Sequence, residues 1–307
     1  MEGRESPAGE TQSGSDWTAK RRVTLVGAVI NLALALGKIV AGVLGHSQAL
    51  IVDGVHSLSD LVSDAVVLGA ARWGSIEPDE NHPYGHERIE TVATAVVGLL
   101  LLGVAVVFVV DAILRLLSPE RLLNPGWLAL SAALLSVLAK EVLYHYTRVI
   151  ARQTRSMLIA ANAWHHRSDA LSSLIVIAGV GGVMLGVTSL DAVAAIVVAL
   201  MVGWMGGRFA LSALIELVDT AAPPREQAEL EIRIRQVDGV CDLADLRTRR
   251  MGGRIVMDVR ILLDPDLSLA QADRIAARVR RTLLDESTEV SDVVVSVAPF
   301  RQDRTGS

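Results

Sequence analysis

The chain has 307 residues, of which 51% are hydrophobic and 4% aromatic, and its mean hydropathy is +0.42. This composition is too apolar for an ordinary soluble domain, so the sequence indicates a membrane protein. A formal net charge of -5 argues against a nucleic-acid partner, and a single cysteine excludes both an internal disulfide and a CxxC metal motif.

Residues 1–19, rich in Gly, Ser and Glu, are predicted to form a disordered cytoplasmic tail. A helix needs about 20 mainly apolar residues to cross a bilayer. Six stretches within residues 20–208 come close to that requirement and predict six transmembrane helices, at 23–44, 49–73, 90–114, 126–146, 160–187 and 190–208. Lys and Arg gather before the first helix and around the second and fourth connections, so both termini are predicted to be cytoplasmic.

The C-terminal part of the chain is rich in charged residues, and apolar and polar residues alternate along parts of it. Residues 209–222 are predicted to be a linker, residues 223–300 a cytosolic α+β domain of order α-β-β-α-β, and residues 301–307 a disordered tail. Helical spacing covers 225–237 and 268–284, and strand patterns cover 254–263 and 290–297. The MGG sequence at 251–253 supplies a hairpin turn.

Four ionisable residues share one face of the second predicted helix. They stand at i, i+3, i+7 and i+11 and are Asp53, His56, Asp60 and Asp64. A charge at the bilayer centre costs about 2.5–3.5 kcal/mol on insertion scales, so such a row is typical of an interior that holds water or ions. For Asp53 and Asp64, a place along an ion pathway and a polar contact between helices are equal alternatives.

A similar spacing returns in the fifth predicted helix, where His165 and Asp169 stand at i and i+4. Together with His56 and Asp60 they offer two imidazole nitrogens and two carboxylate oxygens, a ligand set that suits tetrahedral zinc. Co²⁺, Cd²⁺ and Fe²⁺ fit the same ligands, and the affinity order of divalent ions favours zinc over iron and manganese. His166 lies about 100° around the helix and is assigned a supporting role.

The polar connection PDENHPYGHER at 78–88 contains a second candidate ligand set. Asp79, His82 and His86 could hold a regulatory or accessory metal ion there, although histidines in a loop are often only solvated. Pro83 and Gly85 make the segment a turn, so ligation depends on the conformation of the loop.

Two other charged pairs lie in the predicted helices. Asp111 and Arg115 stand at i and i+4 and are interpreted as a structural ion pair. Lys140 and Glu141 in the fourth helix could neutralise charge or relay protons, but they lie toward its cytoplasmic end, which favours side chains that extend toward the membrane surface.

The segments HSQALIVDGVHSLSD, DENHPYGHERIET and NAWHHRSDALSS, with a tail that contains LRTRRMGG and LDPDLSLAQAD, resemble the cation diffusion facilitator family of metal/proton antiporters. The resemblance covers essentially all of residues 23–299. It implies a multi-pass homodimer in the lipid bilayer of the cytoplasmic membrane, with a ferredoxin-like cytosolic domain. It also implies export of a divalent metal in exchange for protons, with no organic cofactor and no enzymatic reaction.

Carried over to this sequence, the resemblance implies a transport site at His56, Asp60, His165 and Asp169 and a loop site at Asp79, His82 and His86. It further implies a charge contact between Arg88 and Asp219, where the membrane part meets the tail, and an incidental surface contact is an equal alternative. Many relatives carry metal-binding histidines in the cytosolic domain. All seven histidines here precede Leu171, so metal sensing by that domain is not expected.

The leading interpretation is zinc export by alternating access, in which protons displace the metal from the imidazoles and carboxylates. The same scaffold could instead export Fe²⁺ or Mn²⁺. The chain could also be a transport-inactive membrane scaffold, against which the complete quartet argues. An intramembrane metalloenzyme is a further alternative, but four protein ligands close the position at which zinc activates water, and no HExxH base is present.

Overall fold

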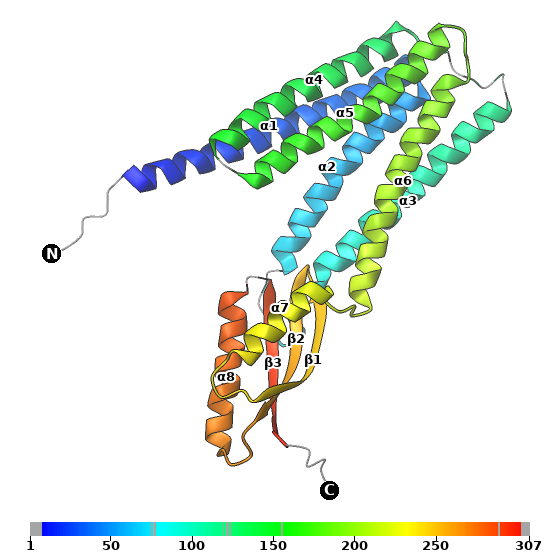
Figure 1. Ribbon diagram of the computed structural model, residues 1–307. Helices are drawn as coiled ribbons and strands as arrows, with labels where there is room; N and C mark the ends of the chain where they lie inside the picture. The colour runs from blue at the N-terminus through cyan, green and yellow to red at the C-terminus, as the bar shows by residue number, and fades with distance from the viewer. Residues whose placement is uncertain are drawn as a thin grey trace. The chain divides into compact units, whose positions relative to one another are not determined.

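The computed structural model describes residues 8–301, apart from positions 75, 77, 119, 121, 123, 155 and 288. Six long helices precede a smaller α+β part (Figure 1). They confirm the six predicted helices and are α1 (Ala8–Leu44), α2 (Gln48–Gly74), α3 (Arg88–Leu117), α4 (Trp127–Gln153), α5 (Met157–Met184) and α6 (Leu190–Leu217).

Five of these helices, all except α2, are long and apolar enough to cross a membrane within the described residues. Helix α2 differs because Asp53, Asp60 and Asp64 interrupt its apolar sequence. The exposed faces of the helices are largely apolar, as expected for surfaces that meet lipid rather than water. On α3, for example, the exposed apolar residues include Val92, Val96, Leu99, Leu100, Val106, Val107 and Val110.

Two helices extend beyond the spans expected from hydropathy. Helix α1 begins at Ala8, within the segment expected to be a disordered tail, and α6 continues to Leu217, within the segment expected to be a linker. Residues 8–19 and 209–217 contain no proline, the residue that would most strongly end a helix. The parts of the two tail predictions at 1–7 and 302–307 lie outside the described residues.

The chain divides into two compact units, Met1–Val66 with Val97–Arg208 and Val67–Val96 with Phe209–Ser307. In the first unit, α4 packs against both α5 and α1. Its core is built mainly from small and β-branched residues, which allow helix backbones to approach closely in a membrane. The alanines of this core are Ala41, Ala49, Ala112, Ala129, Ala133, Ala194, Ala195 and Ala199.

Glycines bring two pairs of helices into direct backbone contact in the first unit. A Cβ atom at Gly54 of α2 would lie 2.9 Å from the backbone nitrogen of Ile39 in α1. A Cβ atom at Gly179 of α5 would lie 2.5 Å from the Cβ of Ala194 in α6. A larger residue would force each pair apart, so α1 is tightly packed on α2 and α5 on α6.

The second unit contains the predicted α-β-β-α-β domain. Its elements are α7 (Pro224–Arg235), β1 (Asp242–Met251), β2 (Arg254–Leu263), α8 (Leu269–Glu286) and β3 (Val290–Pro299). The sheet order is β1-β2-β3, with β1 antiparallel and β3 parallel to β2. Gly252 and Gly253 form the predicted hairpin turn, and both have positive φ values, 58° and 74°, which suit glycine.

The domain has its own apolar core between the sheet and its two helices. Alternate residues of β2 point into this core, as the period of a strand requires. They meet Leu230 and Ile234 of α7 and Val279 and Leu283 of α8. The β2 residues of the core are Ile255, Met257, Val259, Ile261 and Leu263.

Candidate metal site

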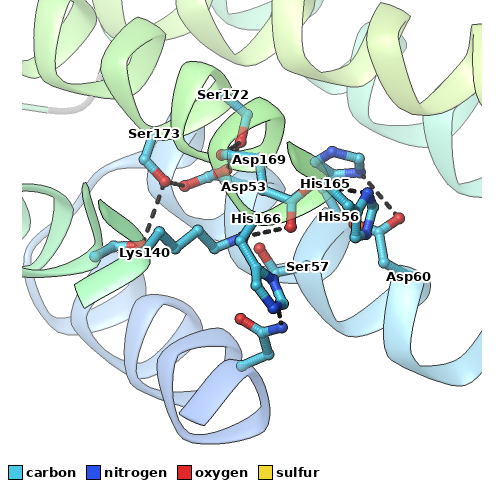
Figure 2. Close-up of polar contacts among 12 residues, drawn as sticks. Asp53, His56, Ser57, Asp60, Lys140, His165, His166, Asp169, Ser172 and Ser173 are labelled. Carbon is cyan, nitrogen blue, oxygen red and sulfur yellow. Dashed lines mark hydrogen bonds and ion pairs between the residues drawn. The ribbon is translucent and has the colours of Figure 1, made fainter. Parts of the chain in front are cut away.

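Helices α2 and α5 bring three residues of the predicted quartet, Asp60, His165 and Asp169, into one cluster in the first unit, and the fourth, His56, lies beside Asp60 (Figure 2). His56 Nδ1 lies 3.8 Å from Asp60 Oδ1 on α2, and His165 Nδ1 lies 3.7 Å from Asp169 Oδ1 on α5. Asp60, His165 and Asp169 each present one ligand atom, and these three atoms lie within 4.8 Å of one another. Ligand atoms of tetrahedral zinc are about 3.3 Å apart, so binding of zinc would require these three atoms to move closer together and His56 to join them.

Three of the four residues of the site are buried, and the site contains polar atoms without hydrogen-bond partners among the described residues. His56, Asp60 and Asp169 are each 8% exposed, whereas the side chain of His165 is 48% exposed. Among the described residues, His56 Nδ1 and Asp60 Oδ2 are buried with no hydrogen-bond partner. Buried polar atoms are usually paired. A cation bound between them would satisfy both atoms.

A cavity of about 80 Å³ lies beside the quartet and is lined in part by Asp60, His165 and Asp169. Asp64 also lines this cavity and is exposed. His166 is a further lining residue, and its buried Nε2 lacks a partner in the part of the chain that the structure describes. The structure therefore places Asp64 and His166 on the walls of the same cavity.

Asp53 lies apart from the cavity, in a network that satisfies both oxygens of its carboxylate. Its Oδ2 lies 3.0 Å from Lys38 Nζ and accepts a hydrogen bond from Ser173 Oγ at 2.7 Å, while its Oδ1 accepts one from Ser172 Oγ at 2.6 Å. The residue is 0% exposed. These contacts link α1, α2 and α5, so the geometry of Asp53 is that of a polar contact between helices.

Two buried lysines differ from what the sequence indicated. The expectation that Lys140 extends to the membrane surface was wrong, because the residue is 1% exposed and its Nζ lies 2.9 Å from Asp169 Oδ2. Lys38 was not recognised, although a lysine within an apolar helix needs a buried partner or a polar cavity. The expected pair of Asp111 and Arg115 is present, at 3.0 Å.

The loop ligands form a cluster of their own in the second unit. Asp79, His82 and His86 present ligand atoms within 4.8 Å of one another. His82 Nδ1 lies 3.1 Å from Asp79 Oδ1, and His86 Nε2 lies 3.4 Å from Asp79 Oδ2. The backbone N–H of His82 donates to the Asp79 carboxylate and holds its pKa below the usual value, which keeps this ligand ionised.

The expected charge partners also meet in the second unit. Arg88 Nη2 donates to Asp219 Oδ1 at 2.7 Å. Glu216 Oε1 accepts a hydrogen bond from the backbone N–H of Gly252 at 2.7 Å. Glu87 Oε1 lies 3.8 Å from Arg254 Nη1. The first contact joins the start of α3 to the segment after α6, and the other two join the end of α6 and the loop before α3 to the β1–β2 hairpin.

Two family descriptions match most of this chain. The cation efflux transmembrane domain matches residues 24–218, and the cytoplasmic domain of cation efflux proteins matches residues 222–300. The chain belongs to the cation diffusion facilitator family. Membership confirms the resemblance drawn from the sequence segments and makes this protein a multi-pass membrane protein of a transporter family.

Relatives from plants and bacteria match over most of the chain. Metal tolerance protein C1 of Arabidopsis thaliana is 36% identical over 293 residues, which cover 91% of this chain and 62% of the relative, so the chain spans less than two thirds of that protein. Manganese efflux system protein MneP of Bacillus subtilis is 31% identical over 290 residues, covering 92% of this chain and 97% of the relative. Magnetosome protein MamB of Magnetospira is 30% identical over 272 residues, which cover 89% of this chain and 92% of the relative.

Proposed function

We propose that this protein exports a divalent transition-metal ion, with zinc as the first candidate, through a site formed by His56, Asp60, His165 and Asp169. The observation that carries the proposal is the cluster of three ligand atoms from two helices within 4.8 Å of one another. The unpaired buried atoms of His56 and Asp60 support it, because they lack a partner that a cation would supply. Two nitrogen and two oxygen ligands suit zinc.

Metal and protons compete for this site. Imidazole and carboxylate ligands bind metal only when deprotonated, so metal release on the far side is coupled to proton uptake. Histidine exchanges protons near neutral pH, which suits antiport by alternating access. The exposed side chain of His165 and the cavity lined by Asp64 form the route from the cytoplasm, and Asp53 stabilises the helices beside that route.

The assembly proposed is a homodimer in the cytoplasmic membrane with both termini in the cytoplasm. The basic residues of the short connections support this orientation. The match to the cytoplasmic domain of cation efflux proteins supports pairing through residues 222–300. Asp79, His82 and His86 are proposed as an accessory metal site in the cytoplasmic loop.

The test is zinc-driven proton flux in proteoliposomes that contain the purified full-length protein. Asp60→Ala and Asp169→Ala should each abolish the flux, because each removes a ligand. Asp238→Ala is a control, since this side chain is 99% exposed and lies in the cytosolic domain. Flux retained by both quartet variants would refute the site, and a folded wild-type protein without flux for any ion would favour the inactive scaffold.

A second candidate ion is Mn²⁺. It is favoured by the match to a manganese efflux system protein over 97% of the relative's length. Carboxylate oxygens suit Mn²⁺, whereas imidazole nitrogens favour zinc in the affinity order. The same flux assay with Mn²⁺, Fe²⁺, Cd²⁺ and Co²⁺ separates the candidates, because the physiological ion should combine high turnover with saturation at low concentration.

A further inference from the structure

Helix α4 adds a cation to a site whose proposed ligands all come from α2 and α5. Lys140 is 1% exposed, and its Nζ lies 2.9 Å from Asp169 Oδ2. The other oxygen of the same carboxylate, Oδ1, lies 3.7 Å from His165 Nδ1. Asp169 therefore faces a proposed fellow ligand with one oxygen and a lysine ammonium with the other (Figure 2).

The other buried lysine of this unit shows how differently a structural lysine is held. Lys38 is also 1% exposed, but its Nζ contacts both Asp53 Oδ2 at 3.0 Å and Ser57 Oγ at 2.7 Å. For Lys140, the described residues provide Asp169 as its hydrogen-bond partner, and its side chain lines the cavity of about 80 Å³. Lys38 is fixed by several contacts, whereas Lys140 is held at one carboxylate beside open space.

Charge balance makes the ammonium of Lys140 a competitor of the metal ion. The carboxylates of Asp60 and Asp169, when ionised, neutralise one divalent cation bound with neutral imidazoles. If Lys140 kept its place on Asp169, the metal, the quartet and Lys140 would together carry one net positive charge, and the other carboxylate that lines the cavity is that of the exposed Asp64. An uncompensated charge in a buried environment is costly, so metal and ammonium compete for Asp169.

We propose that Lys140 is a tethered counter-cation of the transport site. Its ammonium occupies Asp169 when no metal is bound and withdraws along the cavity when the metal takes that carboxylate. Its return competes with the metal and promotes release, so Lys140 is a positioning residue that sets metal affinity. The inference rests on the proposed function, because it requires Asp169 to be a metal ligand.

The test measures metal affinity of the full-length protein in detergent, by calorimetry with Zn²⁺ and by the visible absorption of Co²⁺, which reports tetrahedral coordination. Lys140→Gln removes the charge but keeps an N–H donor for Asp169. Lys140→Arg keeps the charge and adds a forked donor that holds a carboxylate more firmly. Lys38→Gln is the matched control, because it makes the same change at a lysine with the same burial that does not contact the quartet.

Lys140→Gln should bind both ions at least tenfold more tightly and release them more slowly. Lys140→Arg should bind them several-fold more weakly, and Lys38→Gln should match the wild type. Equal or weaker binding by Lys140→Gln overturns the inference, since removal of a merely structural lysine would not tighten the site. Tighter binding by Lys38→Gln to the same degree also overturns it.

Two further outcomes keep the experiment decisive. If Lys140→Gln does not fold, Lys140→Arg decides, and wild-type affinity in that variant overturns the inference. A folded wild-type protein that binds neither ion, or an Asp60→Ala variant with wild-type affinity, refutes the proposed transport site instead. Failure of the counter-cation and failure of the site therefore give different results.

Discussion

Asp191 caps helix α2 although it belongs to α6. The residue is 2% exposed, its Oδ2 accepts the backbone N–H of Gln48 at 2.7 Å, and its Oδ1 accepts the hydroxyl of Ser47 at 2.6 Å. The first backbone N–H groups of a helix have no partner within the helix. Replacement of Asp191 by alanine would leave the first donor of α2 unpaired in a buried position.

The expected loss of stability follows from these contacts. Removal of an N-cap acceptor costs about 0.5–2 kcal/mol, and a buried donor left without a partner costs about 1–3 kcal/mol. The two effects overlap, so Asp191→Ala should lower the free energy of unfolding by about 1–3 kcal/mol. One kcal/mol shifts the Tm of a unit of about 200 residues by about 2–4 °C. The expected decrease in Tm is therefore about 6 °C.

The assay is thermal unfolding of the purified protein in detergent, followed by the loss of the monodisperse fraction after heating. Asp191→Asn keeps an acceptor oxygen and should lose less stability than Asp191→Ala. The exposed Asp238→Ala variant should unfold at the wild-type temperature. A Tm of Asp191→Ala within about 2 °C of wild type would refute the reasoning, since a lost cap of even 1 kcal/mol should shift it further.

Three further predictions concern packing, pH and the loop. Gly54→Ala places a Cβ 2.7 Å from Ile39 Cγ1 and 2.9 Å from the Ile39 backbone nitrogen. It should therefore destabilise the fold by about 1–3 kcal/mol in the thermal assay. Gly37→Ala is the control and should keep wild-type stability, because a Cβ at that position would have no atom within 4 Å. Burial raises the pKa of Glu87, so its contribution to stability is present below about pH 4 and is lost as pH rises through the folded pKa. Glu87→Gln should therefore gain stability relative to wild type as the pH rises above about 4 in thermal unfolding, and a constant difference would contradict this. Asp79→Ala should lose one bound metal per chain, measured by elemental analysis, and retained stoichiometry would contradict the accessory site.

Hydropathy and periodicity predicted the architecture of this chain well where burial controls the sequence. The alternating residue pattern at 254–263 predicted a strand that coincides with β2, because one face of that strand must enter the core. Helix ends were less predictable, since α1 begins within a polar segment and α6 continues through a mainly apolar one, and neither segment carries a local stop signal. The boundary between helix and linker depends on contacts made in three dimensions, such as that of Glu216 with the backbone of Gly252.

The proposed ligands on α2 and α5 were recognisable because histidine and aspartate at i and i+4 occupy one face of a helix. The partners of these residues were not recognisable, because a pair such as Lys140 and Asp169 joins two helices whose relative rotation no local pattern specifies. Asp53 illustrates the same limit. The row of ionisable residues on α2 indicated an ion pathway for Asp53 as readily as a contact between helices. Only the positions of Lys38, Ser172 and Ser173 show that both oxygens of the Asp53 carboxylate have partners.

The glycine contacts place the two halves of the proposed site on two closely packed pairs of helices. Gly54 locks α2 to α1, and Gly179 locks α5 to α6, so each tightly packed pair carries one histidine and one aspartate of the quartet. A motion that separates the two pairs of helices would divide the proposed four-ligand site into two parts with two ligands each. Because two donors hold a divalent ion far more weakly than four, such a motion would by itself lower the affinity of the proposed site, in addition to the competition proposed for Lys140.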